Sequence, residues 1–216
     1  MDNPLLQAFD TPFETAPFSK IKPEHFLPAF EKAIALAKEE VDELPGNKAV
    51  PDFSNTIGAL DFMGEKLDRI SNIFFNLNSA ETSDEIQKIA QTVSPLLSEF
   101  SNDVLLNQAL YTRIKKVFDS KDQLSLSAEQ ETLLEKKYKG FTRNGANLNE
   151  ADKIKLREID KKLSKLSLQF GEHVLAESNA YKLHVLDEND LKGLPEGAKE
   201  AARMLAREQE SEGWVF

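Results

Sequence analysis

The stretch NEADKIKLREIDKKLSKLSLQFGEHVLAESNA, residues 149–180, decides the fold class. Its large apolar residues recur at steps of three and four, which is the spacing of one face of an α-helix. This apolar row consists of Leu156, Ile159, Leu163, Leu166, Phe170 and Val174. The row keeps close to a heptad rhythm, which favours packing alongside a neighbouring helix at about 20°. We therefore predict one long helix whose apolar row is covered by another helix.

The segments before and after this helix show the same spacing. We predict further amphipathic helices from Pro23 to about Pro45-Gly46, from Ser54-Asn55 through Leu77, from Thr82 through Phe100, after Asn102 through Val117, from Ser127 to Gly145, and from Leu194 through Ala206. Thr82–Glu85 and Ser127–Gln130 have the form of capping boxes. Pro95 is expected to kink or divide its helix, and Gly58 and Gly64 are expected to mark close helix approach.

Both ends of the chain differ from the helical middle. Residues 3–21 contain Pro4, Pro12 and Pro17 between apolar residues, which predicts an extended arm packed on the body of the fold. Near the other end, residues 181–186 and 214–216 have the short apolar period of strands. The expected fold is all-α: a multi-helix array with an extended N-terminal arm and a small β element near the C-terminus. The expected divisions are 1–22 (arm), 23–180 (helical domain) and 181–216 (strand, loop, short helix and the start of a second strand).

Composition excludes several classes of protein. The 216 residues are 40% hydrophobic, which is enough for a core, and they include no cysteine, so disulfides, Cys-ligated zinc and thiol catalysis are excluded. Lys and Arg number 27 against 37 Asp and Glu, and this net charge of −10 repels phosphate backbones. We find no basic stripe of useful length, no secretory signal in residues 1–18 and no apolar run of about 20 residues. We therefore expect a cytoplasmic monomer that binds neither nucleic acid nor membrane.

The sequence contains no recognisable catalytic motif. A zinc hydrolase of the HExxH kind needs two imidazoles one helical turn apart, and none of His25, His173 and His184 begins such a motif. His173 and Glu177 are four apart and could share a metal, but a solvent-exposed pair on a helix is the favoured interpretation. G-x-S-x-G and the glycine-rich phosphate loops are also absent. We therefore assign no catalytic, cofactor-binding or metal-binding residue.

One polar corner and two aromatic groups have alternative interpretations. Residues 143–147, RNGAN, could contact a peptide. The favoured interpretation is a helix end with Gly145 in the left-handed conformation and Asn147 or Asn149 capping the next helix. Phe74-Phe75, and Phe13 or Phe18, are interpreted as core residues rather than as a ligand cage.

Several separated strings carry more information than periodicity does. They are NPLL (3–6), PFSKIKPEHFLPAF (17–30), FSNTI (53–57), FFNLNSA (74–80), LLSEF (96–100), FTRNGANL (141–148), LKGLPE (191–196) and GWVF (213–216). In this order they resemble the opening of the thimet oligopeptidase-like zinc metallopeptidases, and they most resemble the branch of peptidyl-dipeptidases (dipeptidyl carboxypeptidases) and oligopeptidase A. The resemblance spans the whole chain.

The resemblance implies a mostly helical protein of two halves that face each other across a deep channel. In the family the catalytic half carries HExxH, a third Glu ligand and a zinc-bound water, and these lie downstream of every residue in this chain. The resemblance thus implies an amino-terminal half that is inactive alone, with its own C-terminal catalytic half and short unfolded peptides as partners and zinc as the cofactor of the parent protein.

A different class of function remains open at this point. The same amphipathic helices would suit a stand-alone helical protein-binding module without enzymatic activity. The coding sequence after Phe216 separates the two: a natural stop codon favours the module, and several hundred further codons that include HExxH favour the peptidase.

Overall fold

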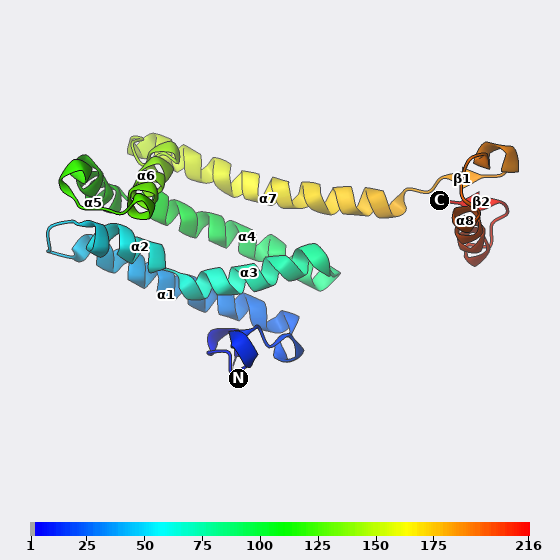
Figure 1. Ribbon diagram of the computed structural model, residues 1–216, viewed down its shortest axis with the longest axis horizontal. Coiled ribbons are helices and arrows are strands. Elements are labelled where there is room, and N and C mark those ends of the chain that lie inside the picture. Colours follow the sequence, from blue (N-terminus) through cyan, green and yellow to red (C-terminus); the bar gives the residue numbers. More distant parts are fainter. Residues whose placement is uncertain (1–2) are drawn as a thin grey trace. The chain divides into compact units, whose positions relative to one another are not determined.

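The computed structural model describes residues 3–216 and is helical through most of that range (Figure 1). By its internal contacts the chain divides into two units, residues 1–168 and residues 169–216. The long helix α7, Glu150–Ala180, belongs to both.

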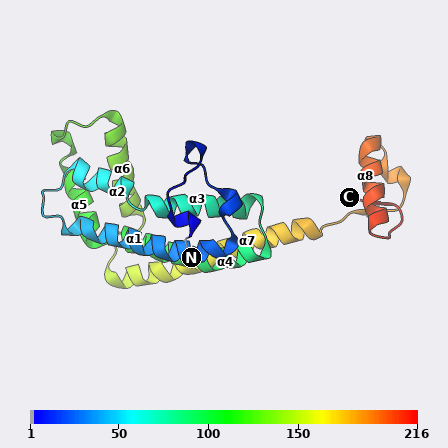
Figure 2. The same ribbon diagram turned by 90° about the horizontal axis from the view of Figure 1, so that it is seen from below.

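Unit 1 is a bundle of α-helices. They are α1 (Phe26–Gly46), α2 (Ala59–Phe62), α3 (Glu65–Ala80), α4 (Asp84–Leu105), α5 (Gln108–Asp119), α6 (Ala128–Arg143) and the first part of α7. Helices α1, α3 and α4 pack side by side, and α5 packs on α6, as Figures 1 and 2 show from two directions. The prediction of a multi-helix all-α array is confirmed.

Two apolar clusters hold unit 1 together. In the first, the rings of Phe26 and Phe30 from α1 meet the ring of Phe74 from α3 edge to face, at centroid distances of 4.9 and 5.4 Å. Edge-to-face pairs of this kind add to the stabilisation that burial supplies. The second cluster joins the end of α1 to α5 and α6 and includes Ile114 and Leu134, both fully buried. The predicted core position of Phe74 is therefore correct.

The N-terminal arm consists of short 3₁₀ turns and packs on the helices through a few residues. Leu5 is fully buried in the first cluster. The Arg69 guanidinium of α3 donates hydrogen bonds to the carbonyl oxygens of Leu5 and Gln7 (3.3 and 3.0 Å) and lies 4.3 Å from the centre of the Phe9 ring. Phe13, which was interpreted as a core residue, is 98% exposed, and Phe18 is more than half exposed, so that interpretation is wrong.

The helix predicted from Ser54-Asn55 through Leu77 is interrupted. A π-helical turn, Phe53–Gly58, leads into α2, and the chain then breaks at Met63-Gly64 before α3 begins. Gly64 has φ = +75°, a left-handed conformation that suits glycine, and its N–H donates to a Glu40 carboxylate oxygen at 2.8 Å. Gly64 therefore ends one helix and starts another, a role that the sequence analysis did not give it.

Helix α4 also differs in detail from the prediction. Its N-cap is Ser83, whose hydroxyl accepts the Ile86 N–H at 3.3 Å, whereas the Thr82 hydroxyl donates to the Asn78 side chain. Pro95 does not divide the helix, which continues past Asn102 to Leu105. The N-cap of α5 is Asn107. The capping box predicted at Ser127 and Gln130 is present at the start of α6.

Helix α7 has the predicted extent, but the predicted packing of its apolar row is wrong. Ile159, Leu163 and Leu166 are 59%, 57% and 50% exposed. Helix α7 instead meets the rest of unit 1 through other residues: Lys153 is buried, Arg157 forms an ion pair with α4, and Leu168 packs on the first cluster. In unit 2, Phe170 and Val174 of the same row are also exposed.

Unit 2 contains the end of α7, a strand pair and one helix. Strand β1 (His184–Val185) pairs with β2 (Trp214–Val215) in antiparallel fashion, with His184 opposite Val215. Helix α8 (Glu196–Glu208) packs on β2, and the Arg203 guanidinium lies 4.9 Å from the centre of the Trp214 ring. The small β element predicted near the C-terminus is confirmed.

Candidate functional site: the groove between α4 and α7

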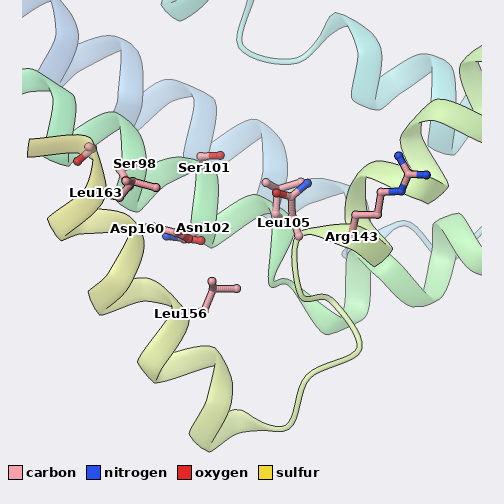
Figure 3. A pocket seen from close by; sticks show the side chains of 10 residues that line it. Ser98, Ser101, Asn102, Leu105, Arg143, Leu156, Asp160 and Leu163 are labelled. Carbon is pink, nitrogen blue, oxygen red and sulfur yellow. The ribbon is translucent and has the colours of Figure 1, made fainter. Parts of the chain in front are cut away.

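Unit 1 contains a groove of about 360 Å³ between α4 and α7, and Figure 3 shows the side chains that line it. They are Ser98, Ser101, Asn102 and Leu105 from α4, Leu156, Asp160, Leu163 and Ser164 from α7, and Arg143 and Asn144 from the end of α6. Both walls are mixed: the α4 wall has one leucine and three polar residues, and the α7 wall has two leucines and two polar residues. We call this cavity the α4–α7 groove.

The turn between α6 and α7 sets one end of the groove. Gly145 has φ = +94°, and the Ala146 N–H donates to the Phe141 carbonyl oxygen at 3.0 Å, which is the backbone pattern of a Schellman helix end. Asn149 then caps α7 by accepting the Asp152 N–H at 3.0 Å. The favoured interpretation of the RNGAN corner as a helix end is therefore correct, with Asn149 as the cap of the next helix.

Close packing at Gly145 fixes where α7 begins. A Cβ atom at this position would lie 2.7 Å from Leu156 Cδ2 and 2.9 Å from Leu148 Cδ1, both closer than real Cβ atoms tolerate. Leu156 belongs to the α7 wall of the groove. The glycine therefore allows α7 to approach the end of α6 and so determines the shape of the groove.

A bridge centred on Asp103 fastens α7 to α4 and α1. One carboxylate oxygen of Asp103 lies 2.8 Å from Lys38 Nζ of α1, and the other accepts a hydrogen bond from Arg157 Nη1 of α7 at 2.7 Å. Partial burial raises the pKa of Asp103, but the hydrogen bonds and positive charges of Lys38 and Arg157 outweigh that effect and hold this pKa below its usual value. The same hydrogen bond raises the pKa of Lys38. Both groups therefore stay charged near neutral pH.

Lys153 gives α7 a second attachment. Its side chain is buried, and its Nζ lies 3.1 Å from Glu150 Oε1 and 3.4 Å from Gln108 Oε1 of α5. The aliphatic part of a buried lysine packs while its ammonium group keeps polar partners. Lys153 and Arg157 thus attach α7 to α5 and α4 by polar contacts, in addition to the apolar contact that Leu168 makes with the first cluster.

The groove can bind a ligand, but its side chains do not form a catalytic arrangement of the kinds sought in the sequence. Arg143 is exposed at one end, where its guanidinium is free to meet a carboxylate, and neither Arg143 nor Asp160 forms an ion pair within residues 3–216. The apolar leucines favour an apolar ligand segment, and the serine hydroxyls can satisfy polar groups beside it. A peptide segment with an apolar face fits this chemistry best.

None of the three histidines lines the groove. His173 and Glu177 are both exposed on α7, and within residues 3–216 no three His, Cys, Asp or Glu side chains are grouped to hold a metal ion. His184 Nε2 lies 2.5 Å from the Glu212 carbonyl oxygen, and His25 Nδ1 accepts the Lys22 N–H.

Sequence analysis missed most of the groove. It singled out Arg143 and Asn144, which lie at one end, but not Ser98, Ser101 or Asp160. The spacing of Ser94, Ser98 and Ser101 places small polar residues on one side of α4, and this was an available signal. No comparable signal paired this side of α4 with α7. In the part of the chain that the structure describes, no helix is both long and apolar enough to cross a membrane.

Comparison with known proteins gives a consistent result. Dipeptidyl carboxypeptidase from Salmonella typhimurium is 34% identical over 207 residues, which cover 96% of this chain and 30% of that protein. Oligopeptidase A from Escherichia coli is 33% identical over 216 residues, which cover 100% of this chain and 31% of that protein. The thimet-like oligopeptidase of Dictyostelium discoideum is 26% identical over 201 residues. The chain thus spans less than a third of the length of these curated relatives.

A family model matches the helical bundle itself. The match covers residues 30–153, from the first turns of α1 to the start of α7, and the family is described as "Neurolysin/Thimet oligopeptidase, N-terminal domain". The matched range is more than half of the chain and contains the whole second apolar cluster and most buried residues of the first, whose Leu5, Phe26 and Ala29 precede it. The resemblance inferred from the separated strings is therefore confirmed, and the chain belongs to the neurolysin/thimet oligopeptidase N-terminal domain family.

Proposed function

We propose that this chain is the amino-terminal, non-catalytic half of a zinc-dependent peptidyl-dipeptidase or oligopeptidase. The observation that carries the proposal is the alignment: nearly the whole chain matches peptidases, yet it covers only 30% or 31% of their length. The matching family model is that of an N-terminal domain. In the parent protein the hydrolytic machinery would then lie outside residues 1–216.

In this proposal the helices of unit 1 act as one wall of a substrate channel. Zinc bound in the other half would polarise the peptide carbonyl and activate a water molecule. The contribution of this half is steric: a packed helical wall narrows the channel, so that short unfolded peptides enter and folded domains do not. The two buried clusters support such a role because closely packed interiors resist deformation.

The proposal extends to partners and location. The partners are short peptides and the chain's own C-terminal catalytic half, and the parent protein would act as a cytoplasmic monomer without nucleic-acid or membrane binding. The net charge of −10 supports the absence of nucleic-acid binding.

The test uses the full-length protein and the 216-residue chain side by side. We expect the full-length protein to release C-terminal dipeptides, or to cleave internally, in short unstructured peptides and to lose this activity on chelation of zinc. We expect no cleavage by the 216-residue chain alone. Equal activity of the full-length protein on a stably folded substrate would refute the steric role, and metal-stimulated cleavage by the 216-residue chain would refute the assignment of this half as non-catalytic.

The exposed apolar row of α7 also favours a second candidate, a stand-alone helical module that binds other proteins. The coding sequence separates the two candidates. An open reading frame that continues for several hundred codons and includes HExxH supports the peptidase, whereas a natural stop codon after Phe216 supports the module.

A further inference from the structure

Three large aliphatic side chains form a continuous exposed row on α7 in unit 1. They are Ile159, Leu163 and Leu166, which we call the α7 stripe, and at least half of each is exposed. Single exposed leucines are common on protein surfaces, but a row at helical spacing marks a surface that another element covers. The stripe therefore indicates a binding surface rather than unrelated single exposed residues.

The way α7 is attached leaves this surface free. Arg157 and Lys153 hold the helix to α4 and α5 by charged contacts, and these residues lie on a different side of the helix from the stripe. Long helices in proteins are normally stabilised by packing their apolar side. In unit 1 the stripe remains uncovered, so its burial would add to the stabilisation that α7 already gains from the packing of Leu168 on the first cluster.

The stripe continues into the α4–α7 groove. Leu163 belongs to both, and Leu156 lies about two turns earlier on the groove wall (Figure 3). Across the groove, the small side chains of Ser98 and Ser101 on α4 leave room for a close approach. An amphipathic helix that lies along α7 would place its apolar residues on the stripe and against the groove, which is the geometry of helix-in-groove recognition.

Charge indicates what kind of helix fits. Between residues 153 and 165 there are six basic side chains and two acidic ones, in a protein whose net charge is −10. Lys161, Lys162 and Lys165 form no ion pair within the described part of the chain. A second copy of α7 would bring the same excess of positive charge, whereas a helix with Asp or Glu beside its apolar row would be attracted.

We propose that the α7 stripe and the α4–α7 groove form the docking surface for an amphipathic helix, flanked by acidic residues, from the downstream catalytic half of the same polypeptide. This inference rests on the proposed function. The length of the relatives supports the choice of occupant, because 69% to 70% of each relative lies outside the match, as the covered shares of 31% and 30% imply. It follows that the α7 stripe joins the two halves and that substrate peptides meet other surfaces of this half.

The absence of cysteine permits a direct test by thiol labelling. Ile159→Cys places a thiol on the stripe, and Ile154→Cys is the matched control: both isoleucines lie on α7 and both are 59% exposed. Five residues separate them, so they point about 140° apart around the helix. Each variant is made in the 216-residue chain and in the full-length protein, and its rate of maleimide labelling is measured. The unsubstituted full-length protein gives the background from any cysteine beyond residue 216.

In the 216-residue chain we expect the two thiols to react at similar rates. In the full-length protein we expect the Ile159→Cys thiol to react at least about tenfold more slowly, because burial limits access to a thiol, and the Ile154→Cys thiol to keep its rate. Equal rates for both variants in the full-length protein would overturn the proposal. Protection of the Ile159→Cys thiol in the 216-residue chain that grows with concentration would also overturn it, because a second copy would then be the occupant.

Peptidase assays on the same preparations keep the two proposals distinguishable. Protection of the Ile159→Cys thiol without zinc-dependent cleavage by the unsubstituted full-length protein would support docking and refute the proposed function. Cleavage without protection would support the proposed function and refute docking at this surface.

Discussion

Gly145 lies in the turn between α6 and α7, and substitution by alanine, which adds one methyl group, tests its backbone conformation. Its φ of +94° is unfavourable for any L-residue with a side chain, and an added Cβ would lie 2.7 Å from Leu156 Cδ2. We expect Gly145→Ala to lower the free energy of unfolding by about 1–3 kcal/mol. Chemical denaturation of the 216-residue chain, followed by circular dichroism, measures this change.

Gly171 provides the matched control for that substitution. It lies inside α7 and a Cβ there would meet nothing within 4 Å. Gly171→Ala should therefore stabilise the helix by about 0.5–1 kcal/mol, because alanine loses less backbone entropy than glycine when a helix forms. Destabilisation of similar size by both substitutions would contradict the left-handed turn at Gly145.

Asp103 should make part of the stability depend on pH. Its pKa in the folded state lies below the ordinary value of 3.8, so folding favours the ionised carboxylate. The stabilisation from the bridge is therefore present above about pH 4 and is lost as the pH falls through the lower, folded-state pKa. We expect Asp103→Asn to cost about 1–2 kcal/mol at pH 7, for two partly exposed pairs, and progressively less at acid pH. Urea denaturation at several pH values measures the difference.

Asp119 serves as the comparison for the bridge. Among the residues that the structure describes, its one ion-pair partner is Lys115 of the same helix, at 2.6 Å, and more than half of its side chain is exposed. Asp119→Asn should therefore cost no more than about 0.5 kcal/mol at pH 7. An equal loss from both substitutions would mean that Asp103 does not join α1, α4 and α7.

At the level of single elements, two neighbouring hydroxyl side chains at the start of α4 form different hydrogen bonds. The Ser83 hydroxyl accepts the Ile86 N–H, whereas the Thr82 hydroxyl donates to the Asn78 side chain and caps no helix N–H. Ser83→Ala should cost about 1 kcal/mol, as the loss of an N-cap usually does. Thr82→Ala should cost clearly less. A larger loss from Thr82→Ala in thermal denaturation would restore Thr82 as the N-cap, as the sequence alone predicted.

Most helices could be predicted from the sequence because the signals that start and end them lie within a few neighbouring residues. Ser127 and Gln130 meet within one turn, and the turn at Gly145 depends on one residue type, so both could be inferred from a few neighbouring letters. The break at Gly64 was missed because the apolar spacing from Ile57 to Leu77 continues across it. A glycine at that point is compatible with either a helix or a turn until its φ is known.

How the elements pack was predicted less well, and α7 shows why. Periodicity identifies residues that share one face of a helix, but it does not identify what covers that face. The contact that positions α7 joins Arg157 to Asp103, which lie 54 residues apart, and nothing near either residue in the sequence indicates the pair. The groove could not be predicted for the same reason, since Ser98 and Asp160 come to line one cavity only after α4 and α7 have been brought together.

At the level of the whole molecule, the family assignment came from separated strings rather than from any catalytic motif. Those strings lie in both units, and their order matches a family whose proteins are more than three times as long as the matched stretch. The bounds 1–22, 23–180 and 181–216 stay a prediction about how such a protein is divided. The uncovered α7 stripe and this length difference both support the proposal that the chain is one part of a longer peptidase.

Zinc should have no effect on the 216-residue chain by itself. A ligand that binds neither the folded nor the unfolded state does not shift their equilibrium, and the described residues supply no group of three metal-ligating side chains. We expect the same Tm in calorimetry with added zinc and with a chelator. In the full-length protein, chelation should lower the Tm, because bound metal stabilises the fold that holds it. A zinc-dependent rise in the Tm of the 216-residue chain that His173→Ala abolishes and His184→Ala preserves would instead assign a metal site to His173 and Glu177.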